Sequence, residues 1–186
     1  MKKKLMIAFV FCTLLLTCAA CGEQTQPEET IQSVVEAMIE DDPQLQEMLL
    51  QNVSYIGPNV EPGDNNAMQE DIDDYLRQKF GAWFSEKGLE KALADGSLSL
   101  SQLYLAMSEA TAQLEDLTII PRDDVGRNFD YSAQLLCKSG DTQEVLEVTG
   151  YMYLDDQGTA DQFAFDREYV FEQWAQKHIT WLPTVQ

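Results

Sequence analysis

Histidine is almost absent from this chain, and cysteine is scarce. The 186 residues include one histidine, His178, and four cysteines. Cys12, Cys18 and Cys21 lie within the first 21 residues, so Cys137 alone remains in the part that can form a domain. A single thiol excludes an internal disulfide and a cysteine metal site there. A nucleophilic thiol needs a basic partner, and no spacing pattern links Cys137 to His178. We therefore expect Cys137 to be a small core residue.

Positive charge is also scarce. The chain has 12 Lys and Arg against 32 Asp and Glu, and three of the basic residues are Lys2, Lys3 and Lys4. Without these three, nine basic residues remain against 32 acidic ones, a formal charge of −23. Binding to phosphates needs clustered Lys and Arg, so we do not expect nucleic acid or anionic headgroups as partners. Cations, basic peptides, or a purely solubilising role for the acidic surface remain open.

The chain lacks the short motifs that mark common active sites. It contains no G-x-S-x-G, no H-E-x-x-H, no phosphate-binding glycine loop and no dinucleotide fingerprint. The acidic segment 155–161 is a conceivable calcium loop, but it lacks the D-x-[DN]-x-[DN]-G spacing. Its place between two predicted strands favours a hairpin turn. We expect no metal site, no cofactor and no enzymatic activity.

The N-terminus is the most informative segment that is present. Three lysines precede an apolar run over 5–16, which is too short to span a bilayer and ends in small residues. The following Cys18-Ala19-Ala20-Cys21 resembles the lipobox of bacterial lipoproteins, with Cys18 where Leu is usual. The resemblance implies cleavage before Cys21 and lipidation of its sulfur. An ordinary secretory signal cut near Ala20 is the alternative.

This pattern predicts the organisation of the chain. Residues 1–20 are expected to be a lipoprotein signal peptide, 21–29 a polar tether, and 30–186 a single domain. The mature protein would then lie at the extracytoplasmic face of the cell membrane, held there through lipid on Cys21.

The first half of the domain has helical periodicity. One apolar stripe follows i, i+3, i+4 spacing and comprises Ile31, Val34, Val35, Met38 and Ile39. Helix caps are predicted at Asp42, at Ser85 and at either Ser99 or Ser101. The segment 52–66, which is rich in Gly and Pro, is predicted to be a loop.

The second half changes to the alternation of β-strands. Turn residues separate four predicted strands, at 114–120, 129–135, 144–153 and 162–166. After them, Asp166 either caps a short helix or continues the strand, and we favour the helix. Helices followed by an antiparallel meander predict an α+β fold, with the N-terminal helices packed on a curved, cone-like sheet of about four strands.

This order of elements resembles the nuclear transport factor two-like, or cystatin-like, α+β cone superfamily. The resemblance lies in residues 75–80 and 89–93, the segment 114–119, and the hairpin strands up to Phe165. It extends to small lipoproteins of Gram-positive gut bacteria. It implies a cone whose open end can hold a small molecule and an outer sheet face that can form a homodimer. Enzymes of the superfamily use an Asp or His inside the cone, but His178 falls outside the matched region.

Three functions remain open at this point. The first is a membrane-anchored, non-catalytic module that binds a small ligand or a protein. The second is a structural envelope protein that acts by protein contact, and the third is a small isomerase or hydrolase using the cone. We expect the tryptophans to be core residues and not part of a binding surface; they are Trp83, Trp174 and Trp181. Trp181 is the candidate exception, because it lies close to the C-terminus.

Overall fold

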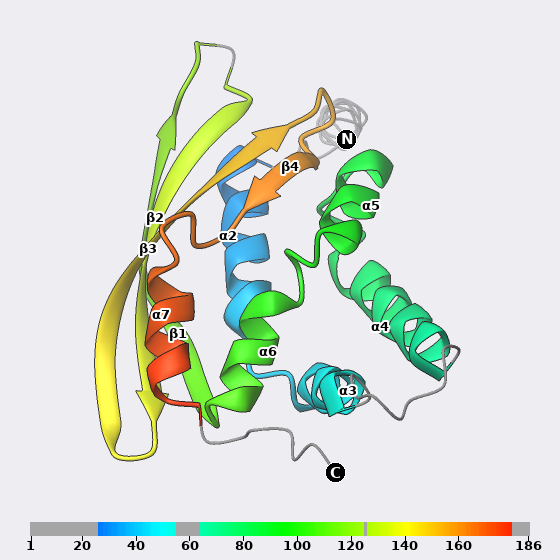
Figure 1. The fold of residues 1–186 in the computed structure, drawn as a ribbon. Coiled ribbons are helices and arrows are strands. Elements are labelled where there is room, and N and C mark those ends of the chain that lie inside the picture. The colour runs from blue at the N-terminus through cyan, green and yellow to red at the C-terminus, as the bar shows by residue number, and fades with distance from the viewer. Residues whose placement is uncertain (1–25, 55–63, 125, 180–186) are drawn as a thin grey trace, which may run out of the picture.

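The computed structural model describes residues 26–54, 64–124 and 126–179. These residues form an α+β fold in which helices pack on one four-stranded antiparallel sheet (Figure 1). The strands follow one another in the sheet as β1-β2-β3-β4, which makes it a meander. The predicted fold class and sheet are therefore confirmed. Cys21 and Trp181 lie outside the described residues.

The helices and strands have the following bounds. The helices are α2 (Pro27–Ile39), α3 (Pro43–Ser54), α4 (Asp64–Phe80), α5 (Glu86–Ala94), α6 (Leu100–Met107) and α7 (Val170–Lys177). The strands are β1 (Ala110–Pro121), β2 (Asn128–Ser139), β3 (Thr142–Leu154) and β4 (Ala160–Ala164). None of the helices in the described part is both long enough and apolar enough to cross a membrane.

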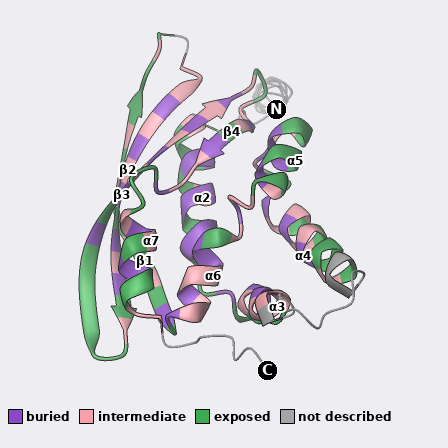
Figure 2. Ribbon diagram, in the orientation of Figure 1, coloured by how far each residue is buried: buried purple, intermediate pink, exposed green. Residues whose placement is uncertain are grey.

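The core lies between the sheet and the helices. Figure 2 shows buried residues on α2 and on alternate positions of the strands, whereas other positions along β1 and β3 are exposed. All five residues of the predicted apolar stripe on α2 are buried, with Ile31, Val34 and Val35 fully so. Because α2 contacts β1, α4 and α6, this stripe joins the sheet to two other helices.

Several helix boundaries agree with their predicted signals. Asp42 caps α3, since its Oδ1 accepts a hydrogen bond from the Leu45 N–H at 3.1 Å. Ser85 caps α5 by accepting from the Gly88 N–H at 3.0 Å. Ser99 precedes α6 but makes no capping bond with its side chain, and the Ser101 hydroxyl donates to the Met38 carbonyl at 2.7 Å instead. Ser99 therefore occupies the predicted N-cap position of α6, but its side chain does not satisfy the helix N–H groups.

Other boundaries shift by a few residues. Helix α2 begins at Pro27, so its first turn occupies the end of the predicted tether. Residues 52–54 and 64–66 of the predicted loop belong to α3 and α4, and 55–63 lie outside the described residues. Strand β4 ends at Ala164, before Asp166, and the favoured C-terminal helix is present as α7.

A bulge explains how β1 keeps one face toward the core. The pairing of β1 with β2 slips by one residue between Leu114 and Asp116. Leu114 and Leu117, which are an odd number of residues apart, can therefore both lie on the core side of the sheet. The bulge and two neighbouring acidic residues also make this edge a poor template for pairing with another strand. The outer face keeps Ile120 and Val145 exposed, and a homodimer through it stays a prediction.

The short strand β4 is held on its outer side by the segment before α5. The Ala160 N–H donates to the Trp83 carbonyl at 2.7 Å, and the Ser85 N–H donates to the Ala160 carbonyl at 3.0 Å. The Ser85 hydroxyl also lies 2.7 Å from Asp161 Oδ1. These bonds join the helical half of the chain to the last strand of the sheet.

On its inner side, β4 is held by a tyrosine that crosses β3. Tyr131 of β2 lies opposite Gly150 of β3, and its hydroxyl donates to the Ala164 carbonyl at 2.9 Å. A Cβ at position 150 would come within 2.2 Å of the Tyr131 Cζ and hydroxyl oxygen, so only glycine lets the ring pass. Tyr131 is buried, and its ring stacks on Phe163 at 6.5 Å.

Candidate functional site

A pocket of about 290 Å³ lies where α5, α6 and α7 meet the end of the sheet. We call it the α6–α7 pocket; Figure 1 shows α6 and α7 side by side with β4 beyond them. It is lined by Lys91, Asp95, Ser97, Leu100, Ser101, Tyr104, Tyr151, Phe163, Ala164, Phe165, Asp166, Tyr169, Phe171 and Glu172. Six of these fourteen residues are aromatic, which gives the pocket an apolar body with polar groups around it.

The turn from β4 to α7 forms one wall of the pocket. Asp166 and Tyr169 both have left-handed backbone conformations, with φ of 55° and 58°. The Asp166 carboxylate accepts hydrogen bonds from the Val170 N–H at 2.7 Å and from the Glu172 N–H at 3.0 Å. It therefore caps α7 from four residues before the helix, where a negative charge is stabilised by the exposed N–H groups.

The aromatic wall is fixed by ring contacts to the core. Phe165 meets Phe171 edge to face at 6.0 Å, and Phe171 packs on Trp174 at 6.2 Å. Phe163 meets Phe84 edge to face at 5.9 Å. Since Phe171 and Trp174 are buried, the lining of the pocket continues into the core of the domain.

Some polar groups of the pocket form an ion pair, whereas others form only hydrogen bonds with uncharged side chains. Lys91 and Asp95 form an ion pair at 2.9 Å. Glu172 accepts a hydrogen bond from Gln176 at 3.0 Å. Burial raises the pKa of the Tyr104 phenol, and its hydrogen bond with Glu172 raises it further. Tyr104 is therefore a neutral hydrogen-bonding group at neutral pH, unable to act as a base.

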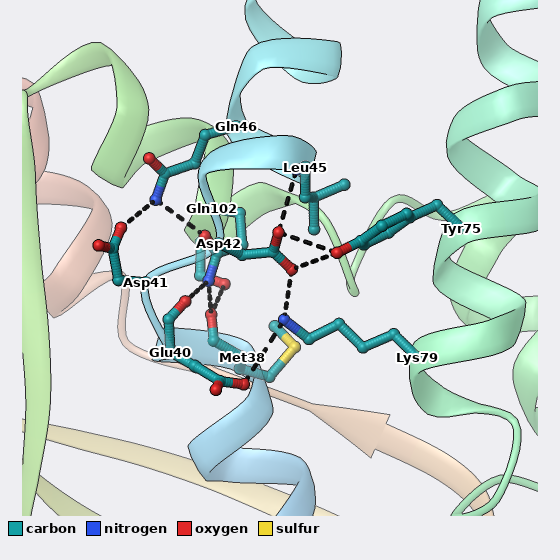
Figure 3. A network of polar contacts seen from close by, with 10 residues as sticks. Met38, Glu40, Asp41, Asp42, Leu45, Gln46, Tyr75, Lys79 and Gln102 are labelled. Atoms are coloured by element: carbon teal, nitrogen blue, oxygen red, sulfur yellow. Dashed lines mark hydrogen bonds and ion pairs between the residues drawn. The ribbon is translucent and has the colours of Figure 1, made fainter.

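A second polar cluster joins α4 to the corner between α2 and α3 (Figure 3). Asp42 accepts hydrogen bonds from Lys79 Nζ at 2.6 Å and from the Tyr75 hydroxyl at 2.9 Å, in addition to the Leu45 N–H. Gln102 of α6 donates to the carbonyls of Met38 and Glu40 at 3.0 and 2.7 Å. The carbonyls at the end of α2 are thereby satisfied by a side chain from another helix.

This cluster is built to hold helices together and is unsuited to proton transfer. Burial alone would raise the pKa of Asp42, but the hydrogen bonds from Lys79, Leu45 and Tyr75 outweigh it and hold the pKa below its usual value. Burial and the bond to Asp42 raise the pKa of Tyr75. A carboxylate that is always ionised and a phenol that is always protonated make a poor acid–base pair near neutral pH.

The structure keeps Cys137 and His178 in separate surroundings. Cys137 is fully buried in β2, and burial raises the pKa of its thiol to about 12. His178 follows α7, where its ring lies 4.7 Å from that of Trp174 and its Nδ1 lies 2.9 Å from the Trp174 carbonyl. Cys137 is a core residue, as predicted, and its thiol is protonated at neutral pH.

The acidic turn 155–161 is a hairpin turn with its own bonds. Asp155 Oδ1 accepts from the N–H groups of Gln157 and Thr159 at 2.9 and 3.0 Å, and Oδ2 accepts from the Thr159 hydroxyl at 2.8 Å. In the part of the chain that the structure describes, no three His, Cys, Asp or Glu side chains are grouped so as to hold a metal ion. Trp83 and Trp174 both belong to the core or pack against it.

The pocket residues were not singled out by sequence reasoning. Asp166 was predicted only as a helix cap, and this role is present. Tyr169 and Glu172 carried no signal, because a pocket formed between distant segments has no local pattern. Similarly, Tyr75 and Lys79 are one helical turn apart, but no pattern in the sequence predicts that both contact Asp42.

The chain matches no family model, no curated protein and no solved structure. The resemblance to the α+β cone superfamily therefore stays a prediction, and the site has to be interpreted from its own geometry.

We predict that Lys79→Met destabilises the domain strongly at neutral pH. The substitution leaves the Asp42 carboxylate, whose side chain is 9% exposed, without its cation, which costs about 3–5 kcal/mol. The loss should shrink at acidic pH, because Asp42 without Lys79 can take up a proton. Denaturant unfolding at two pH values measures both effects.

Lys87→Met is the matched control, since it breaks a pair with Asp161 in which the lysine side chain is 79% exposed. Its expected cost is below about 1 kcal/mol. Equal costs for the two variants would contradict the role given to the Asp42 cluster.

Proposed function

We propose that the protein is a lipoprotein, anchored at the extracytoplasmic face of the cell membrane, that binds a small ligand in the α6–α7 pocket without catalysing a reaction. The proposal joins two independent observations, the N-terminal signal with Cys21 and the pocket itself. A lipid anchor holds a domain at the surface, where a binding function needs only a preformed cavity.

The observation that carries the binding function is the pocket's composition. Aromatic side chains form most of its apolar lining, and a few polar side chains converge on it. Its walls are continuous with the core through Phe171 and Trp174, so the cavity is largely formed before a ligand arrives. A preformed cavity lowers the ordering cost of binding.

The electrostatics of the described groups support binding over catalysis. General acid–base chemistry favours a group whose pKa lies near the working pH. The pKa values of Tyr75, Tyr104 and Cys137 are raised further from neutrality, and that of Asp42 is lowered further from it. All four groups are thus driven toward a single protonation state.

We predict that Cys21→Ser releases the protein from the membrane. Each buried CH₂ of an acyl chain contributes about 0.8 kcal/mol, and two or more chains give nearly permanent anchoring. Membrane fractionation and palmitate labelling of the full-length protein, expressed in a bacterial host, measure the change. Cys18→Ser is the matched control and should leave both unchanged. Labelling that survives Cys21→Ser would contradict the anchor.

We predict that Leu100→Trp abolishes ligand binding in the pocket. Leu100 lines the cavity and is 45% exposed, so a larger ring there occupies ligand space without disturbing the core. A ligand at one hundred times its Kd stabilises the protein by about 2.7 kcal/mol. A thermal-shift screen of small amines, alcohols and carboxylates should therefore find compounds that stabilise the parent protein and leave Leu100→Trp unaffected.

Val145→Trp is the control for that screen, because Val145 is exposed on β3 and does not line the pocket. It should respond to the compounds as the parent protein does. If no compound stabilises the parent, the binding module is wrong and a structural envelope protein takes its place.

A further inference from the structure

Two carboxylates of the α6–α7 pocket lack cationic partners. The pocket is lined by three acidic residues and one lysine, and that lysine, Lys91, is paired with Asp95. Among the residues that the structure describes, neither Asp166 nor Glu172 takes part in an ion pair. Asp166 is only 8% exposed, so its charge is held mainly by two N–H groups of α7.

Both carboxylates retain capacity for further hydrogen bonds. An ionised carboxylate has about four acceptor sites. Asp166 uses two of them on the N–H groups of Val170 and Glu172. Glu172 is hydrogen-bonded to Gln176 and Tyr104, neither of which carries positive charge at neutral pH. Asp166 is buried and Glu172 is half-buried, and neither forms an ion pair with a cation of the described residues, so a cationic ligand group would supply a counter-charge to both.

Aromatic rings line the same pocket as these carboxylates. Tyr104, Phe165 and Tyr169 line the same pocket as Asp166 and Glu172. The faces of such rings attract ammonium and guanidinium groups, by about 0.5–2 kcal/mol per contact. The molecule contains one such contact beside the pocket: the guanidinium of Arg167, which does not line the pocket, lies 5.6 Å from the ring centre of the lining residue Tyr151.

The backbone of Tyr169 has an unfavourable conformation. Its φ of 58° is left-handed, which is unfavourable by about 1–2 kcal/mol for residues other than glycine. Its side chain is also 61% exposed, so the ring gains little from burial. Strained residues of this kind cluster at ligand sites, and the position of Tyr169 at the pocket agrees with a role in binding.

We propose that the α6–α7 pocket binds an organic cation, a molecule with an ammonium head and an apolar body. This inference rests on the proposed binding function. The ammonium group lies between Asp166 and Glu172, and the apolar body lies along Phe165 and the ring of Tyr104. An anionic ligand would face two uncompensated carboxylates, and a neutral ligand would leave them without a counter-charge.

The test compares three probes of similar shape and different charge: 2-phenylethylamine, 2-phenylethanol and phenylacetate. Calorimetric titration of the full chain in non-ionic detergent, at low and at moderate salt, measures each affinity. We expect the amine to bind at least about tenfold more tightly than the alcohol, because each desolvated charge pair adds to its affinity. Phenylacetate should not bind detectably.

Two variants separate the pocket from the general acidity of the protein. Glu172→Gln removes one pocket charge and should bring the affinity for the amine close to that for the alcohol. Glu70→Gln makes the same change on the exposed side of α4, outside the pocket, and should leave all affinities unchanged. Asp166 is left intact because it caps α7.

The outcomes distinguish this proposal from the one on which it rests. Equal affinities for amine and alcohol, both lost in Leu100→Trp, would overturn the cation preference and leave the binding module standing. Equal weakening of the amine by Glu172→Gln and Glu70→Gln would also overturn it, since only net charge would then matter. If no probe binds and no compound of the thermal-shift screen does, both proposals fail.

Tyr169→Gly gives a second, independent readout. Glycine relieves the left-handed strain, so thermal stability should be unchanged or higher. The affinity for 2-phenylethylamine should nevertheless fall severalfold, because the ring is lost. A lower stability together with unchanged affinity would show that Tyr169 serves the fold alone.

Discussion

The passage of the Tyr131 ring across Gly150 is the constraint on which the functional end of the molecule depends. The ring bridges three strands: it starts on β2, crosses β3 and donates a hydrogen bond to the Ala164 carbonyl of β4. Strand β4 is short, and two residues after Ala164 the chain turns at Asp166 to enter α7. The position of α7, and with it one wall of the pocket, therefore follows from where Tyr131 holds the end of β4.

The other wall depends on the polar cluster around Asp42. Lys79 and Tyr75 tie α4 to the start of α3, and Gln102 ties α6 to the end of α2. Since α6 carries Leu100 and Tyr104 into the pocket, the cluster determines how α6 lies against the sheet. The Tyr131–Ala164 hydrogen bond thus positions α7, and the polar cluster around Asp42 positions α6. The groups of both are engaged in structure, whereas Asp166 and Glu172 of the pocket form no ion pair among the described residues.

Local signals predicted the elements well. The α2 stripe, the caps at Asp42 and Ser85, and the antiparallel meander all follow from periodicity and turn residues acting over a few positions. The opposition of Tyr131 and Gly150 also follows from the sequence, because a two-residue turn at Gly140-Asp141 determines the hairpin register. Gly150, a glycine inside a predicted strand, is a further signal of a close approach between chain segments.

The pocket could not be predicted in the same way. Its residues come from three helices, two strands, the turn between α5 and α6, and the turn at 165–169, so no local pattern groups them. Only the packing of α6 against α7 brings Tyr104 next to Glu172. Of the two alternatives for the cap of α6, Ser99 occupies the N-cap position, whereas the hydroxyl of Ser101 is bonded to the distant Met38 carbonyl of α2.

The most direct test of this account is amide hydrogen exchange in Gly150→Ala. A methyl group at position 150 forces the Tyr131 ring away from Ala164, which overpacks the core at a cost of about 1–3 kcal/mol. The account predicts that exchange accelerates by about tenfold or more at the amides of β4 and at Val170 and Glu172, which Asp166 caps, and much less at those of α3 and α4. Uniform acceleration across the domain, or none at α7, would contradict the claim that this contact builds the pocket.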